Sequence, residues 1–326
     1  MTAATGAAFS GRLRLRLFGI PSSESGFARR GFAPAAPVVQ ARLEGIGATF
    51  IEGYRAALLH DEAGPLKARL QLIAPELRGF AYEGAGMGLA LSDFFTPWRK
   101  RWQTFLEGPG ADHAYMMHVG LGWAWARLPV SISRRLDRLD PLLRWLAVDG
   151  YGFHQGYFRW PRFIDAQERP RLSGYALRAF DQGLGRSLWF VRGANVEQVA
   201  ATLAGFPSDR QADLWGGVGL ACAYAGGVAR EEVERLALAA GAHRPRLAQG
   251  MAFAAKARER AGNLAPHTEL ACQAVWHRSA AAAAQLTDQA LAGLREEAGV
   301  PAYERWRQRI ASYAEPPSGS VPRQDA

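Results

Sequence analysis

Cysteine and lysine are both scarce in this chain of 326 residues. The two cysteines, Cys222 and Cys272, form no Cys-x-x-Cys pair, so the sequence holds neither a disulfide framework nor a cysteine-rich zinc motif. We expect a cytoplasmic protein, because reducing compartments keep thiols unpaired.

Lysine occurs only three times, and most of the net charge of +9 comes from arginines scattered along the chain. Without a clustered basic face, we expect no nucleic-acid partner.

Long apolar runs are missing as well. No segment approaches the roughly 20 consecutive apolar residues that cross a bilayer, so we expect no transmembrane segment. The opening stretch "MTAATGAAFSGRLRLRLFGI" is interrupted by arginines where a secretory signal needs an apolar core. The closing stretch "EPPSGSVPRQDA" is rich in proline and serine, which is typical of disorder.

Glycine, in contrast, is abundant and recurs in one short phrase. Seven copies follow the pattern of two small residues separated by one position: "LEGIGATF" (Gly45), "YEGAGMGLAL" (Gly84), "HVGLGWAWA" (Gly120), "VDGYGFHQG" (Gly150), "DQGLGRSLWF" (Gly183), "WGGVGLACA" (Gly217) and "AQGMAFAAKA" (Gly250). Their first glycines are separated by 39, 36, 30, 33, 34 and 33 residues. A period in the low thirties is typical of helical-hairpin repeats.

The glycine phrase is better explained by helix packing than by phosphate binding. A phosphate loop needs a strand before it and a loop-to-helix junction, and the flanks here read as helices. Each glycine inside a helix costs about 0.5–1 kcal/mol relative to alanine, so a compensating contact is expected. The first glycine and the residue four positions later share a helix face and are both small in five copies: Gly84/Gly88, Gly120/Ala124, Gly183/Ser187, Gly217/Ala221 and Gly250/Ala254. We therefore predict close helix crossings at these positions.

These features predict an all-α fold, an array of about seven α/α helical hairpins. Two forms remain open, a tetratricopeptide-like open superhelix and a closed α/α toroid. We expect an N-terminal extension at 1–25, the helical-repeat domain at 26–312 and a disordered tail at 313–326. Pro161 and Pro170 interrupt "YFRWPRFIDAQERPRLSG", so the second helix of that hairpin should be short or broken.

Polar side chains recur immediately before the first glycine of the copies. Glu44, Glu83, Asp149, Gln182 and Gln249 occupy this position, and Asp181 lies one residue earlier in its copy. If the hairpins stack in register, these groups lie on equivalent faces and line one groove or cavity. The alternative is that they cap neighbouring helices or satisfy buried backbone groups.

Histidines near the third and fourth copies raise the question of a metal site. His118 precedes Gly120, and His154 follows Gly150. Together with Glu83 and Asp149 they offer ligand types that zinc accepts. However, no His-Glu-x-x-His, Cys-x-x-Cys or His-x-His motif is present. We therefore predict no metal site.

Aromatic residues are dense in the middle third of the chain, for example Trp123, Phe153, Tyr157 and Phe190. Most of them are expected in the core, and some are suited to an apolar pocket for a long unsaturated ligand. No nucleophile elbow or Ser-His-Asp order accompanies them.

The ordered set of phrases resembles a known family. The phrases are "RGFAYEGAGMGLAL", "HAYMMHVGLGWAWARL", "LDPLLRWLAVDGYGFHQGYF", "GYALRAFDQGLGRSLWFVRGA", "DLWGGVGLACAYAGG" and "LAQGMAFAAKARERAGN". They are similar to those of bacterial proteins of unassigned biochemistry that are encoded beside the iterative polyketide synthase in enediyne antibiotic gene clusters. The resemblance covers roughly residues 25–280. It implies an accessory role in maturing the polyene product of that synthase, and it carries no catalytic residue with it.

Two functions therefore remain open. In the first, the protein binds a linear polyene and helps to modify it, with six candidate site residues: Glu83, His118, Asp149, His154, Asp181 and Arg186. No nicotinamide or flavin fingerprint is present, so the cofactor is unknown. In the second, the helical array is a non-catalytic scaffold that binds the polyketide synthase or a tailoring enzyme.

Overall fold

The chain was analysed as a computed structural model, which describes residues 11–295, 297 and 299–314. Residues 11–18 are helical, and the α-helices that follow are α2 (Phe27–Arg30), α3 (Pro37–Leu59), α4 (Ala63–Gln71), α5 (Pro75–Phe95), α6 (Arg101–Glu107), α7 (Ala114–Trp125), α8 (Ile132–Leu136), α9 (Arg144–Phe158), α10 (Tyr175–Val191), α11 (Val196–Ala204), α12 (Ser208–Ala225), α13 (Arg230–Ala239), α14 (Arg244–Arg260), α15 (Pro266–Trp276), α16 (Ala280–Leu291) and α17 (Ala302–Ser312). Within the described residues there is no β-strand, only one isolated bridge between Glu297 and Val300. None of the described helices is long and apolar enough to cross a membrane.

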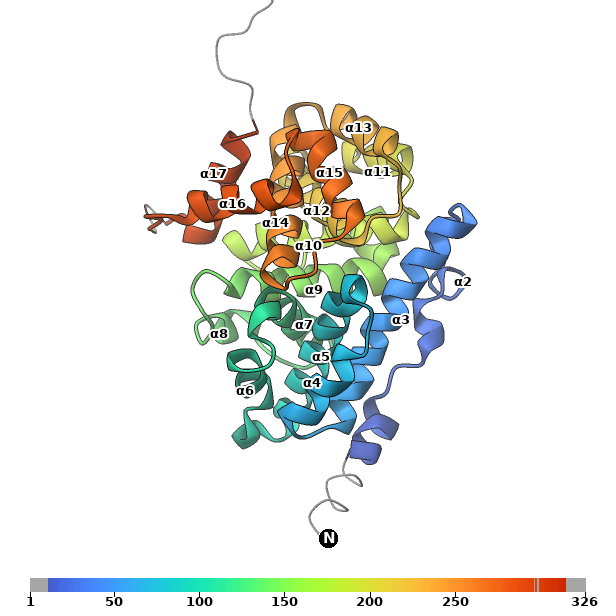
Figure 1. Cartoon of the computed structure of the whole chain (residues 1–326), viewed down its shortest axis with the longest axis vertical. Helices are drawn as coiled ribbons and strands as arrows, with labels where there is room; N and C mark the ends of the chain where they lie inside the picture. Colours follow the sequence, from blue (N-terminus) through green and yellow to red (C-terminus); the bar gives the residue numbers. More distant parts are fainter. Residues whose placement is uncertain (1–10, 296, 298, 315–326) are drawn as a thin grey trace, which may run out of the picture.

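The predicted all-α repeat array is confirmed. The inner helices α3, α5, α7, α9, α10, α12, α14 and α16 each pack against the next in the series, and shorter helices connect them on the outside (Figure 1). Between α9 and α10 the connection contains only a single π-helical turn, Pro161–Asp165, as the two prolines predict. The array extends one inner helix, α16, beyond the seven glycine copies.

Glycine permits backbone contact at every inner crossing from α3 to α14. A Cβ on the first glycine of a copy would overlap a carbonyl oxygen of the preceding inner helix: Gly120 meets Glu83, Gly150 meets Val119, Gly183 meets Asp149, Gly217 meets Gln182 and Gly250 meets Gly216. The second glycine of a copy faces the following inner helix instead, as Gly122 does at Ala147 and Gly185 does at Leu214. One phrase therefore serves two crossings, one on each side of its helix.

The first copy was placed in the wrong register by the sequence pattern. A Cβ on Gly45 would meet no described atom within 4 Å, and one on Gly47 would meet Ser25 rather than another inner helix. The helix crossing instead uses Gly53, which faces Ala81. Gly53 thus corresponds to the second small residue of the pattern, and the first falls two residues earlier, at Ile51. Ile51 lies 33 residues before Gly84, so the corrected first spacing matches the later ones. Glu44 consequently leaves the series of equivalent polar positions.

The array curls so tightly that side chains of inner helices far apart in the series touch one another. The Phe80 ring on α5 lies edge-on to Tyr224 on α12, with 5.0 Å between the ring centroids. The Arg258 guanidinium on α14 donates to the carbonyl of Glu76 at the start of α5. These contacts cross the inner face of the superhelix, where side chains leave only small cavities.

The segment before α2 packs on this array. The Tyr54 hydroxyl donates to the carbonyl of Phe18, and Ile20 is buried. At the other end, α17 finishes at Ser312. The tail predicted to be disordered lies, from residue 315 onward, outside the described residues.

The close helix crossings predict opposite effects on stability for alanine substitutions at two glycines inside helices. Gly183→Ala should destabilise the fold by about 2 kcal/mol or more, because the new methyl overlaps the Asp149 carbonyl and the helices must separate. Gly45→Ala should instead stabilise it by about 0.5–1 kcal/mol, since the site is open and alanine favours helix. Urea unfolding of both variants checks this. Equal effects of the two substitutions would contradict the backbone-contact model.

Candidate active site

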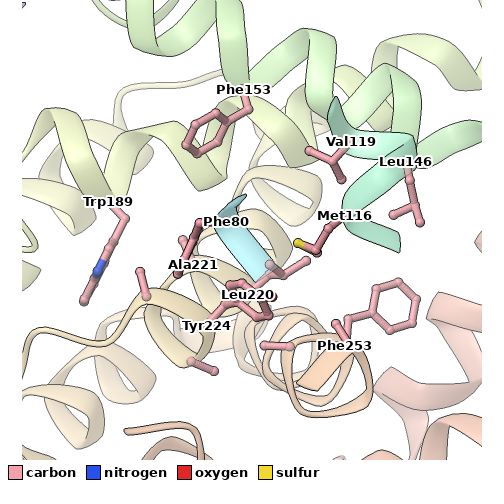
Figure 2. Close-up of a cluster of buried hydrophobic side chains, with 14 of the residues drawn as sticks. Phe80, Met116, Val119, Leu146, Phe153, Trp189, Leu220, Ala221, Tyr224 and Phe253 are labelled. Atoms are coloured by element: carbon pink, nitrogen blue, oxygen red, sulfur yellow. The ribbon is translucent and has the colours of Figure 1, made fainter. Parts of the chain in front are cut away.

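Two apolar cavities lie along the superhelix axis. The first is a partly open cavity of about 50 Å³, bordered by side chains from α3, α5, α7, α9, α10 and α12, together with Ile20, Glu24 and Ser25. The second, about 20 Å³, is bordered by α7, α9, α10, α12, α14 and α17. Figure 2 shows their apolar walls, with Phe80, Ala221 and Tyr224 on the side of the first cavity and Met116, Leu146 and Phe253 on that of the second.

Arg186 borders both cavities, as does Leu220. On one side of Arg186 lies Glu83, whose Oε2 is 3.8 Å from the guanidinium. On the other side Asp149 accepts a hydrogen bond from the guanidinium through Oδ1. All three side chains are at least 95% buried. Three consecutive inner crossings separate α5 from α10, so only the tight turn of the superhelix brings these charges together.

The two carboxylates differ in how they are held. Asp149 accepts from Arg186 at Oδ1 and from the Gln182 amide at Oδ2, 2.8 Å away. Glu83 accepts only from the Trp123 indole, at 3.0 Å through Oε1, among the described residues. Burial raises the pKa of Glu83 to about 7, and the Asp149 charge adds to this, whereas Arg186 and the Trp123 hydrogen bond lower it. Glu83 is therefore the group that can exchange a proton near neutral pH.

The charge balance explains this asymmetry. Arg186 and Asp149 form a neutral ion pair, and a second ionised carboxylate would leave one net negative charge in an apolar interior. Burial lowers the pKa of Arg186, but the two carboxylates outweigh it and raise the pKa above its ordinary value. Arg186 thus stays charged, and protonation of Glu83 is the step that neutralises the site.

The other three candidate residues lie apart from this centre. His118 pairs through Nδ1 with the carbonyl of Ala114 at 2.8 Å and packs edge-on against Trp102. Asp181 accepts both arms of the Arg210 guanidinium, which ties α10 to α12. Neither residue borders the two axial cavities. Their surroundings are those of structural groups.

His154 is buried between aromatic rings. Its ring centroid lies 5.4 Å from that of Trp123 and 4.7 Å from that of Phe158, and Nδ1 has no hydrogen-bond partner among the described residues. Burial lowers its pKa to about 3, with further lowering from Arg127 and Arg159. A histidine in this position stays neutral at physiological pH and packs beside the cavity wall.

The described residues contain no group of three or more His, Cys, Asp and Glu side chains that could hold a metal ion. The set considered from the sequence is dispersed, because His118 pairs with backbone and His154 packs between rings.

Sequence reasoning missed the part that α17 plays. Tyr303 receives a hydrogen bond from Gln182 at 3.1 Å and borders the second cavity together with Trp306. A buried ionic cluster fixes α17 in place, because Arg307 contacts Asp213 at 2.6 Å and Glu304 at 3.1 Å. The arginines around it hold the pKa of Glu304 at about 2 although burial opposes this. The helix-like segment "AYERWRQRI" lies after the glycine copies, so the repeat pattern gave no signal for it.

The raised pKa of Glu83 predicts a specific dependence of stability on pH. The unfolded chain ionises Glu83 near pH 4.5 and the folded chain near pH 7, so between these values only the unfolded state is stabilised by ionisation and the wild type loses stability as pH rises. Glu83→Gln should therefore match the wild type at low pH. Above pH 7 it should exceed the wild type by about 3 kcal/mol, since each pKa unit is worth about 1.4 kcal/mol.

Denaturant unfolding of both proteins across this pH range measures the difference, in which the contributions of all other titrating groups cancel. A difference that does not vary with pH would mean that Glu83 keeps an ordinary pKa in the folded protein.

Comparison with known proteins gives one result. No curated protein and no solved structure matches the chain. A family model matches residues 9–314, nearly the whole chain. The chain thus belongs to the family described as "Protein of unknown function (DUF1702)".

Proposed function

We propose that this protein binds a linear, apolar, unsaturated molecule in its axial cavities. The observation that carries this proposal is the aromatic-walled first cavity with Glu83 and Arg186 in its wall. An apolar cavity with a few convergent polar groups, one of them with a perturbed pKa, is the usual form of a small-molecule site. Buried charge also lowers stability, and a ligand contact gives a reason for keeping it there.

The resemblance to proteins of enediyne gene clusters supplies the proposed biological role. We infer that the ligand is the polyene product of the iterative polyketide synthase and that the protein helps to mature it. The phrases that carry the resemblance fall on α5, α7, α9, α10, α12 and α14, which supply most of the walls of the two cavities. The two cysteines are buried and unpaired, which supports a cytoplasmic site of action.

The scaffold alternative has less support. A helical scaffold needs an open concave face to hold a partner protein. Here the concave face is occupied by the contacts of α5 with α12 and of α14 with the start of α5. A partner synthase or tailoring enzyme would have to use the outer surface.

Ligand binding can be tested with the polyene released by an enediyne-type synthase. An achiral polyene should acquire an induced circular dichroism band when the chiral cavity encloses it. Leu220→Phe should weaken binding by at least about tenfold, or about 1.4 kcal/mol, because its ring fills space at the border of both cavities. Leu238→Phe is the matched control, because Leu238 lies on α13 and is 81% exposed.

An induced band that Leu220→Phe leaves intact would place the ligand elsewhere, and the absence of any band would refute the proposed function. Mass spectrometry of the same mixtures, with and without cell extract from a strain lacking the gene, then detects any product that depends on the protein. Co-purification of the protein with the synthase, without a new product mass, would favour the scaffold.

A further inference from the structure

Arg186 is buried with most of its hydrogen-bonding capacity unused. A guanidinium carries five N–H donors. Among the described residues, this one donates a single hydrogen bond, to Asp149, while Glu83 stays 3.8 Å away. The guanidinium carbon also lies 5.0 Å from the centroid of the Phe153 ring. The side chain is 4% exposed and borders both cavities, so a molecule bound in either of them lies beside the guanidinium. The remaining donors therefore favour a ligand that carries a hydrogen-bond acceptor.

Glu83 borders the same cavity with one carboxyl oxygen uncommitted. Trp123 holds Oε1 and fixes the plane of the carboxyl group, whereas Oε2 accepts no hydrogen bond from the described residues. A proton-transfer group and a cationic donor thus lie side by side in an apolar enclosure. This pairing is what proton abstraction next to a carbonyl requires, because the base removes a carbon-bound proton while the donor stabilises the charge on oxygen.

Building on the proposed function, we infer that the ligand is an unsaturated carbonyl compound whose oxygen binds Arg186, and that Glu83 moves a proton along its carbon chain. The reaction class is double-bond isomerisation by proton transfer. The reaction is redox-neutral, so it requires neither oxidant nor reductant. The apolar walls match the hydrocarbon part of such a molecule in polarity.

The step balances as follows for a β,γ-unsaturated ketone. The Glu83 carboxylate takes a proton from the α-carbon, the C–H electron pair forms a new bond to the carbonyl carbon, and the carbonyl π pair moves onto oxygen beside Arg186. The oxygen pair then re-forms the carbonyl, the double bond shifts to the α,β position, and the γ-carbon takes the proton back from Glu83. Glu83 ends as the carboxylate, and Asp149 keeps Arg186 oriented throughout.

The experiment uses a long-chain β,γ-unsaturated ketone as the probe in D₂O. The wild-type protein should speed up appearance of the conjugated isomer, seen as a new ultraviolet absorbance. Because Glu83 carries the α-proton to the γ-carbon, mass spectrometry should find less deuterium in this product than in product formed by buffer alone. Glu83→Gln keeps an acceptor for Trp123 and removes the proton carrier, so its rate should fall at least about a hundredfold while probe binding persists. Glu52→Gln, at a half-exposed carboxylate on α3, is the matched control and should leave the rate unchanged.

The experiment distinguishes failure of the proposed function from failure of the proton-transfer inference. If the probe and the polyene both leave the cavity empty, the proposed function fails and this inference fails with it. If the probe binds but the wild type isomerises it no faster than buffer does, only the proton-transfer inference is overturned. If Glu83→Gln does not fold, Glu83→Asp tests the same point, because a retained but misplaced carboxyl should keep part of the rate. A rate in a folded Glu83 variant equal to that of the wild type overturns the inference as well.

Discussion

The contact of one helix backbone with the next is the constraint on which the rest of this structure depends. At each inner crossing from α3 to α14 a glycine lies where a Cβ would strike a neighbouring helix, and a carbonyl oxygen occupies that space in most of them. Such contact brings helix axes closer than ordinary side chains allow. The glycines cost helix stability locally, and the close packing of six consecutive crossings compensates for it.

The close crossings also determine what lies on the axis. A wider repeat array would leave a groove open to solvent, but here α12 and α14 return to α5. Side chains that face inward from α5, α9 and α10 are therefore removed from water together. In this medium Arg186 remains charged, and Glu83 takes up a proton near neutral pH. The chemistry proposed for the protein follows from this burial.

The sequence predicted the repeat array, and three of its six candidate residues lie together in the structure. The repeated phrase revealed the crossings because a glycine is required at each of them, and Glu83, Asp149 and Arg186 lie within or beside its copies. The register of the first copy was wrong because Gly45 resembles the phrase but faces open space. His118 and Asp181 share the spacing but point toward a backbone carbonyl and toward Arg210, and one-dimensional spacing does not reveal such directions. Tyr303 is joined to Gln182 across 121 residues, which no local pattern encodes.

The most direct test of this account is a crystal structure of the protein grown with a long-chain unsaturated ketone that carries a heavy halogen at its far end. The account predicts the ketone oxygen within hydrogen-bond distance of the Arg186 guanidinium, the hydrocarbon chain along Phe80 and Phe153, and the anomalous signal of the halogen inside the axial cavities. A halogen signal only on the outer surface, with Arg186 still bound to Asp149 alone, would contradict the assignment of the axis as the functional site.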